Sequence, residues 1–190
     1  IHSSAYNIKT WPELTDPTSR VEELISNELS KYNEIFVAVK NKFRATVVVN
    51  NFEFQKTTPG GHWETTAPGG SVRFISKLNE KFVELVSSFA NVQVHDLNHF
   101  ANYIGLKKFH STRDFFTSRS VVAHEYLPEF AYSVATTIKS IFSKSHKLLI
   151  LDLDNTLWGG IIGDDGVENL SLDQGDALSE AYLDFQSYVK

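Results

Sequence analysis

The sequence predicts an α/β fold with a parallel sheet, because helical patterns alternate with short apolar runs along most of its 190 residues. Hydrophobic residues make up 42% of the chain and aromatic residues 13%, which excludes a disordered protein and allows a sizeable core. No apolar run approaches the roughly eighteen residues of a membrane span, and no signal-like segment opens the chain. Together these observations favour a soluble, cytoplasmic protein.

Charge and composition exclude several further classes. The chain has 18 Lys and Arg residues against 23 Asp and Glu residues, a net charge of -5, and its basic residues are scattered. This pattern argues against a nucleic-acid-binding or anionic-membrane surface. Because cysteine is absent, disulfides, thiolate metal sites and a cysteine nucleophile are excluded. The chain starts at Ile1 and contains no methionine, so we expect it to be part of a longer polypeptide.

The first half of the chain reads as strand exit, helix, strand, loop, helix and strand. Residues 1–17 are polar and turn-rich, typical of the exit from a strand. A helix is expected after Pro17, with Asp16 and Pro17 as its cap and first turn. Its apolar residues recur three or four positions apart: Val21, Leu24, Ile25, Leu29, Tyr32, Ile35, Phe36 and Val39. The elements expected next are a strand in 44–52, a long loop at 55–70, a helix over 75–89 and a strand in 91–97.

The second half begins with a less regular stretch that extends to about Glu125. A helix is expected over 127–141, followed by a polar hinge at 143–147 and a new buried strand at 147–151. Asp165-Gly166, between two segments able to extend, predicts a hairpin. A final amphipathic helix is expected from about Asp176.

The stretch "LLILDLDNTLWGG", residues 148–160, carries the chemistry. Ligands of open parallel sheets bind at the carboxyl ends of strands, where Asp152 and Asp154 are expected. Two carboxylates one residue apart can face a single hard cation, and Mg²⁺ suits such a site because it takes oxygen ligands and bridges to phosphate. Asp152 could then act as a nucleophile and Asp154 as a general acid/base. Alternatively, Asp and Asn side chains simply end a strand through local hydrogen bonds. The apolar run before the motif and "LWGG" after it favour a phosphoryl-handling site.

The longer stretch "LILDLDNTLWGGIIGDDGVENL", residues 149–170, resembles the first motif of the haloacid dehalogenase (HAD) superfamily, specifically subfamily IIIC, the FkbH-like proteins. The resemblance implies that residues 144–190 form the first strand, flap and helix of a HAD Rossmann-like domain, with squiggle and flap over about 157–172. It implies that Asp152 is the phosphorylated nucleophile and Asp154 the general acid/base, and that Mg²⁺ is held by the Asp152 carboxylate and the Asp154 carbonyl. The expected substrate contacts are Leu153, Thr156, Trp158, Gly159 and Gly160.

The same resemblance implies a phosphorylated small-molecule substrate. Several FkbH-like proteins load a glyceryl unit onto an acyl carrier protein in polyketide biosynthesis, and others are known only as phosphatases. A HAD active site also needs a Ser or Thr after the second strand, a later Lys and a later acidic pair. None of these is expected in 144–190, so we expect the chain alone to be inactive and to bind Mg²⁺ weakly.

Residues 1–143 resemble the latter part of the SGNH/flavodoxin-like α/β domain that commonly precedes the HAD domain in FkbH-like proteins. In the SGNH group a Ser follows the first strand, an Asn follows a middle strand, and an Asp-x-x-His precedes the last helix. Asn51, or its neighbour Asn50, occupies the Asn position, with a turn role as the alternative. His124 occupies the His position, but Val121 replaces the Asp, which favours a degenerate site.

Two alternative functions therefore remain open for the chain. One is an SGNH-like esterase or acyltransferase, and the other is a non-catalytic module that docks a carrier protein. The loop at 55–70 carries His62, Trp63 and Glu64 between glycines, and it is expected either to contact a ligand or partner or to be a plain surface loop.

Overall fold

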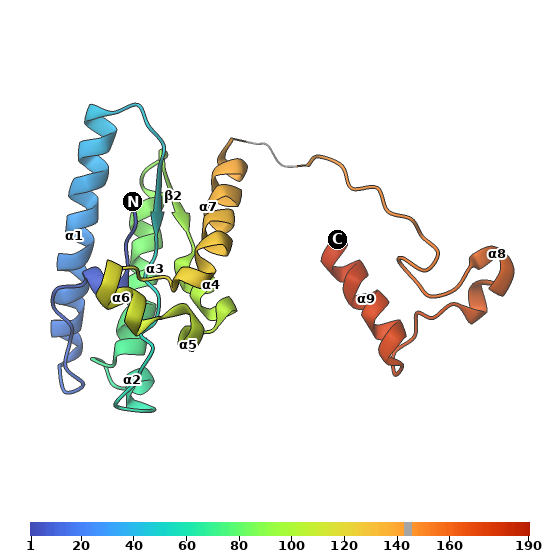
Figure 1. The fold of residues 1–190 in the computed structure, drawn as a ribbon, viewed down its shortest axis with the longest axis horizontal. Coiled ribbons are helices and arrows are strands. Elements are labelled where there is room, and N and C mark those ends of the chain that lie inside the picture. Colours follow the sequence, from blue (N-terminus) through green and yellow to red (C-terminus); the bar gives the residue numbers. More distant parts are fainter. Residues whose placement is uncertain (143–145) are drawn as a thin grey trace. The chain divides into compact units, whose positions relative to one another are not determined.

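The computed structural model describes residues 1–142 and 146–190, which divide into two units, Ile1–Ser143 and Lys144–Lys190 (Figure 1). Residues 143–145 of the expected hinge lie outside the described residues. We refer to the two parts as unit 1 and unit 2. The family to which each unit belongs stays a prediction at this stage.

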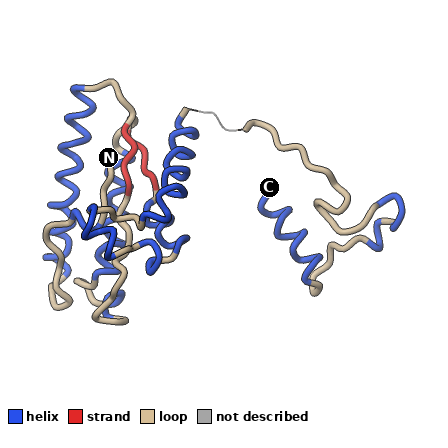
Figure 2. The backbone as a smooth tube through the Cα atoms, viewed as in Figure 1, coloured by secondary structure: helices blue, strands red, loops and turns tan. Residues whose placement is uncertain are grey.

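The sheet of unit 1 contains two parallel strands, β1 (Val47–Asn50) and β2 (Val92–His95), coloured red in Figure 2. The pairing register runs from Val47 opposite Val92 to Asn50 opposite His95. The first residue of the chain lies along the other edge of β1, since the amino terminus of Ile1 donates to the Val48 carbonyl at 2.6 Å and Asn50 N donates to the Ile1 carbonyl at 3.3 Å. The predicted α/β class and the parallel pairing are therefore confirmed.

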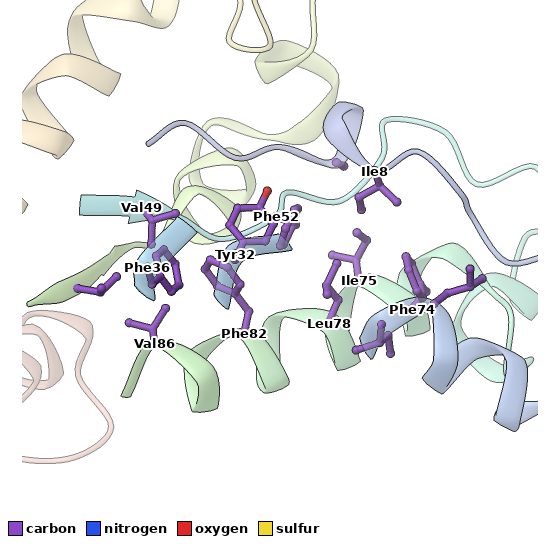
Figure 3. Packing of buried hydrophobic residues seen from close by; sticks show 14 of the residues in the cluster. Ile8, Tyr32, Phe36, Val49, Phe52, Phe74, Ile75, Leu78, Phe82 and Val86 are labelled. Carbon is purple, nitrogen blue, oxygen red and sulfur yellow. The ribbon is translucent and has the colours of Figure 1, made fainter. Parts of the chain in front are cut away.

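The main core of unit 1 lies among α1 (Thr18–Lys42), α3 (Ser71–Ser87) and the two strands (Figure 3). Both helices were expected from the spacing of their apolar residues, and all of those residues except Ile35, which is 40% exposed, pack into this core. Aromatic rings dominate it, with Tyr32 and Phe52 packed edge-on against Phe82 at ring-centre distances of 5.1 and 5.5 Å. The fully buried members include Val21, Phe36, Val49, Phe52, Phe74, Ile75, Leu78 and Phe82.

The prediction that Asp16 caps the first helix is wrong. Pro17 occupies the N-cap position of α1 and provides no side-chain hydrogen bond. Asp16 instead accepts a hydrogen bond from Glu13 N at 2.9 Å through Oδ2, so its carboxylate closes the preceding turn. Local side-chain bonds of this kind compete with helix capping in Asp residues.

Between β2 and α7 the chain forms short helices that the sequence pattern did not predict. They are α4 (Leu97–Ile104), α5 (Leu106–Phe109) and α6 (Thr112–Ser118), followed by the 3₁₀ turn His124–Tyr126. The expected helix over 127–141 is confirmed as α7 (Leu127–Ile141). Apart from α6, these elements contribute to a second, smaller core: Leu97, Phe100, Ala101, Phe109 and Val122, with Phe130 of α7 packed against it. The remaining short elements of unit 1 are the 3₁₀ turn Ala5–Asn7 and α2 (Trp63–Thr66).

In unit 2, the strand expected at 147–151 does not form. The run is extended but unpaired, and Leu148, Leu149 and Ile150 are 74%, 64% and 83% exposed. A strand exists only through hydrogen bonds to a neighbouring strand, and none of the described residues supplies one. The apolar residues of this run therefore have the composition of a buried strand, but the described residues contain no strand with which the run pairs.

The predicted hairpin at Asp165-Gly166 is also wrong. Asp165 ends a short helix, α8 (Ile162–Asp165), and its Oδ2 accepts a hydrogen bond from Ile161 N at 2.8 Å. Gly166, with φ of 74°, follows α8 and begins the 3₁₀ turn Val167–Asn169. The glycine thus serves a helix end rather than a two-residue hairpin turn.

The final helix is confirmed as α9 (Ala177–Val189). Asp176 is its N-cap and accepts from Ser179 N at 3.1 Å through Oδ2. Across residues 1–142 and 146–190, no helix combines the length and the apolar run that crossing a membrane requires.

Glu53 is a fully buried carboxyl in unit 1, three residues after the end of β1. It accepts hydrogen bonds from the Ser4 hydroxyl at 2.6 Å and from Ala5 N at 3.2 Å. Burial raises the pKa of Glu53 to about 7, although these hydrogen bonds act in the opposite direction. The carboxyl therefore fastens the amino-terminal segment to the chain that leaves β1.

This raised pKa predicts a pH-dependent stability. The folded-state pKa of about 7 lies above the ordinary glutamate value of 4.5, so the stabilising contribution of Glu53 is complete below pH 4.5 and is lost as pH rises through 7. We expect the free energy of unfolding of the wild type, relative to Glu53→Gln, to fall by about 3 kcal/mol over this range. Urea unfolding at several pH values measures it. The control Glu34→Gln, on the exposed face of α1, should leave the pH dependence unchanged, and an E53Q profile parallel to the wild type would contradict the prediction.

Candidate functional site

Asp152 follows the extended apolar run of unit 2 and is exposed. Its Oδ1 accepts a hydrogen bond from Leu153 N at 2.9 Å, a contact within the same turn. Within the described residues no cation pairs with its carboxylate and no other donor reaches it. The carboxylate is thus sterically accessible to a ligand.

Asp154 is bound more closely into its loop. Its Oδ1 accepts from the indole Nε1 of Trp158 at 3.0 Å and from Ile162 N at 3.3 Å, and no described residue donates to its Oδ2. The carboxylate therefore organises the loop through one oxygen and leaves the other open. The sequence did not predict this contact, although an Asp four residues before a Trp allows it.

Two glycines and an Asn fix the course of the loop after Asp154. Asn155 has φ of 53° in the left-handed region, and its Oδ1 accepts from Gly160 N at 3.0 Å. Gly159 and Ser171 exchange backbone hydrogen bonds of 3.2 and 2.8 Å as an isolated antiparallel bridge. A Cβ on Gly159 would lie 2.9 Å from the Ser171 Cβ and 3.0 Å from the Tyr182 ring. The loop can close only because Gly159 has no side chain.

The expected substrate contacts fall in two places on this loop. Trp158, Gly159 and Gly160 share the hydrogen-bonded segment with Asp154. Thr156 instead lines a hollow of about 270 Å³ beside α9, together with Leu178, Ala181, Tyr182 and Phe185. Leu153 is 51% exposed. Their role in substrate binding stays a prediction.

The described residues contain no group of three or more His, Asp or Glu side chains able to enclose a metal ion. A cation in the loop of unit 2 would therefore have few protein ligands. That condition suits Mg²⁺, which usually keeps several waters and takes one or two carboxylates together with phosphate oxygens.

In unit 1, both polar ends of the Asn51 side chain are already used. Nδ2 donates to Asp96 Oδ1 at 2.8 Å, and Oδ1 accepts from Asn98 N at 2.9 Å. Asn51 thus joins the chain leaving β1 to the chain leaving β2. Its neighbour Asn50 is also buried and donates through Nδ2 to His2 Nδ1 at 2.6 Å.

His124 contacts a different set of residues. Its backbone N donates to Asp114 Oδ2 at 2.9 Å, its Nδ1 lies 3.5 Å from Asp114 Oδ1, and its Nε2 lies 3.0 Å from Ser118 Oγ. The Asp-x-x-His pattern does not include Asp114, because this partner of His124 lies ten residues upstream, on α6. Ser118 Oγ also donates to the Asp114 carbonyl, so these contacts hold a loop against α6. Asn51 and His124 share no hydrogen-bond partner among the described residues.

The loop at 55–70 is braced from within by Glu64. This buried carboxylate accepts from Gly60 N at 3.0 Å and from Ser71 N at 2.8 Å, and the backbone hydrogen bond from Ser71 holds the pKa of Glu64 below its usual value. Trp63 remains 57% exposed, with His62 packed edge-on against it at 5.9 Å. The structure therefore gives Glu64 a structural role, and the exposed rings of Trp63 and His62 form an open aromatic surface.

Comparison with solved structures identifies the fold. The chain is similar to the crystal structure of the N-terminal part of the protein BF1531 from Bacteroides fragilis, which contains a phosphatase domain and is complexed with Mg. The match has a TM-score of 0.81 and 22% sequence identity, and it covers 98% of this chain and 48% of the other. This chain thus spans about half the length of that structure and shares its fold. No family model and no curated protein matches the chain.

The close approach at Gly159 yields a test of the loop. Gly159→Ala should cost about 1–3 kcal/mol through overpacking against Ser171 and Tyr182, and so accelerate amide exchange of Gly159 and Ser171 by about tenfold or more. Hydrogen exchange followed by NMR measures this. Gly163→Ala is the matched control, because its Cβ meets nothing within 4 Å. Equal exchange rates in both variants would refute the steric account.

Proposed function

We propose that this chain carries the nucleophile-bearing part of a Mg²⁺-dependent phosphatase or phosphotransferase that works through an aspartyl-phosphate on Asp152. The accessible Asp152 carboxylate, next to a loop ordered by Asp154, is the observation that carries the proposal. The similarity of fold to a structure that contains a phosphatase domain supports it. The substrate would be a phosphorylated small molecule.

The charge of unit 2 supports the need for a cation. Residues 148–189 contain no Lys or Arg, and their acidic residues are Asp152, Asp154, Asp164, Asp165, Glu168, Asp173, Asp176, Glu180 and Asp184. A phosphate dianion approaching this segment would meet only negative formal charge, which repels it. A bound divalent cation would reverse the local potential. Mg²⁺ fits because the available donors are all oxygens.

The residues that would hold Mg²⁺ are Asp152, through its carboxylate, and Asp154, through its backbone carbonyl. No described residue donates a hydrogen bond to that carbonyl oxygen, so it is free to coordinate. When bound, the cation would neutralise the phosphate oxygens and stabilise the charge of the transferring group. The protein complexed with Mg in the similar structure is consistent with this choice.

In the proposed reaction, an oxygen of Asp152 attacks phosphorus and the bond from phosphorus to the substrate oxygen breaks. Asp154, protonated at its open oxygen, gives its proton to the departing oxygen. Asp154 then takes a proton from a water that attacks the aspartyl-phosphate, which releases phosphate and restores Asp152. The donors Trp158 Nε1 and Ile162 N keep the Asp154 carboxylate oriented throughout.

The finer proposal is that the protein is a HAD-type, FkbH-like enzyme, with unit 1 as the latter part of an SGNH-like domain. Glyceryl loading of an acyl carrier protein would then be the reaction that the phosphoryl site serves. Its support is the motif at 149–170. In unit 1, the engaged side chains of Asn51 and His124 favour a structural rather than hydrolytic role for that domain.

Replacement of the nucleophile tests the proposed reaction. In the full-length protein, Asp152→Asn should lower Mg²⁺-dependent phosphate release from an aryl phosphate by on the order of a thousandfold or more, since the amide cannot form the phosphorylated intermediate. A hydroxylamine-sensitive phosphoryl label on the protein should disappear in the same variant. Asp173→Asn, an exposed carboxylate outside the motif, is the control. Retained phosphate release by D152N would exclude Asp152 as the nucleophile.

A further inference from the structure

A second concave region lies in unit 1, where the chain leaves the carboxyl ends of its strands. The segments that form it are Tyr6 with its neighbours, residues 55–57 after β1, and residues 107–113 after β2. Figure 1 shows α5 and α6 in this part of unit 1. In open parallel sheets this is the edge at which ligands bind.

The larger of two adjoining cavities has a volume of about 690 Å³ and is rich in cations. Its charged lining consists of Lys56, Lys107, Lys108 and Arg113, against the carboxylates Asp114 and Glu125. Asp114 is already occupied, because it accepts from His124 N and lies 3.5 Å from the His124 ring. Among residues 1–142 and 146–190, no carboxylate lies within ion-pair distance of any of the four cations. In a chain of net charge -5, four cations against two carboxylates make a local excess of positive charge.

The second cavity, of about 330 Å³, shares Lys56 and His110 with the first. Its wall includes the rings of Tyr6 and Trp11 and the side chain of Ile8. Tyr6 is held by stacking on Phe115 of α6, with ring centres 4.2 Å apart. An aromatic compartment therefore adjoins a cationic one.

His110 lies at the junction of the two cavities and is 5% exposed. Its Nε2 lies 3.0 Å from the Phe54 carbonyl, which can only accept, so Nε2 carries the proton and Nδ1 is an acceptor. Nδ1 is buried and has no partner among the described residues. A buried acceptor of this kind costs free energy as long as no donor reaches it.

We propose that these two cavities form a binding site for a small phosphorylated molecule that carries a ring. Its phosphate or diphosphate lies against Lys107, Lys108 and Arg113, and its ring lies in the compartment of Tyr6 and Trp11. The combined size matches that of small-molecule sites, whereas a flat acidic protein surface would not fill the aromatic compartment. The site uses protein cations, so it needs no metal ion and is independent of Asp152.

Titration of the chain with two probes tests this site. The isotopically labelled protein is titrated with inorganic diphosphate and with a nucleoside diphosphate, in EDTA at fixed ionic strength, and amide shifts are followed by NMR. We expect shifts in residues 55–57 and 106–113 with both probes, and tighter binding of the nucleoside diphosphate because its ring adds contacts. The double variant Lys108→Gln/Arg113→Gln should weaken binding of both by about tenfold. Lys56→Gln, at the junction, should weaken it as well.

Lys77→Gln/Lys81→Gln is the matched control, since it removes the same charge from α3, away from both cavities. Unchanged affinity in K108Q/R113Q, or equal loss in the control, would overturn the anion site. Equal affinity for the two probes would overturn the role of the aromatic compartment. A polyglutamate peptide that binds the same residues more tightly than either diphosphate would show that the surface serves an acidic protein instead, which also contradicts the proposal.

Discussion

The buried segment that leaves β1, residues 50–53, must satisfy its polar groups away from water, and the crevice of unit 1 depends on how it does so. Asn79 bonds the backbone of this segment, and the segment's own side chains Asn51 and Glu53 find partners outside it. Asn79 of α3 donates to the Phe52 carbonyl at 2.7 Å and accepts from Phe52 N at 2.9 Å, replacing the ladder bonds that end with β1. Asn51 holds the start of α4, and Glu53 holds the amino-terminal segment. Residues 54–57 therefore leave from a fixed point.

The parts of unit 1 that could be predicted from the sequence are those with long local patterns, and the parts that could not are held by tertiary hydrogen bonds. The helices α1, α3 and α7 follow from apolar residues three or four apart, because a long amphipathic face has one stable way to pack. The helices between β2 and α7 have eight residues or fewer, so the periodic pattern is too short to recognise. Their positions are fixed by tertiary bonds such as that of Asn51 to Asp96, which join residues 45 apart. A single sequence carries no signal for such a pairing.

In unit 2, two elements predicted from local composition, a strand and a hairpin, differ from the observed structure. The run at 148–151 has the composition of a buried strand. A strand forms only when two segments pair through backbone hydrogen bonds, and no described residue pairs with this run. The Asp165-Gly166 pair has the composition of a hairpin turn, but the Asp165 carboxylate is used by Ile161 N at the start of α8. The close positions of Asp152 and Asp154 in sequence predicted a shared site. The structure adds that Asp154 is held by Trp158, which residue types alone did not indicate.

The two proposed phosphate sites, one in each unit, differ in the source of the positive charge that a phosphate would meet. A phosphate needs compensating positive charge wherever it binds. The loop of unit 2 is acidic and has no Lys or Arg over 148–189, so a phosphate bound there as proposed would depend on a bound divalent cation. The crevice of unit 1 has four cationic side chains of its own against two carboxylates. Binding in the first case should depend on divalent metal, whereas binding in the second should depend on ionic strength, because salt screens exposed lysines. This difference would allow the two proposed sites to be distinguished without substitutions, because removal of divalent metal should abolish phosphate binding at the acidic loop alone.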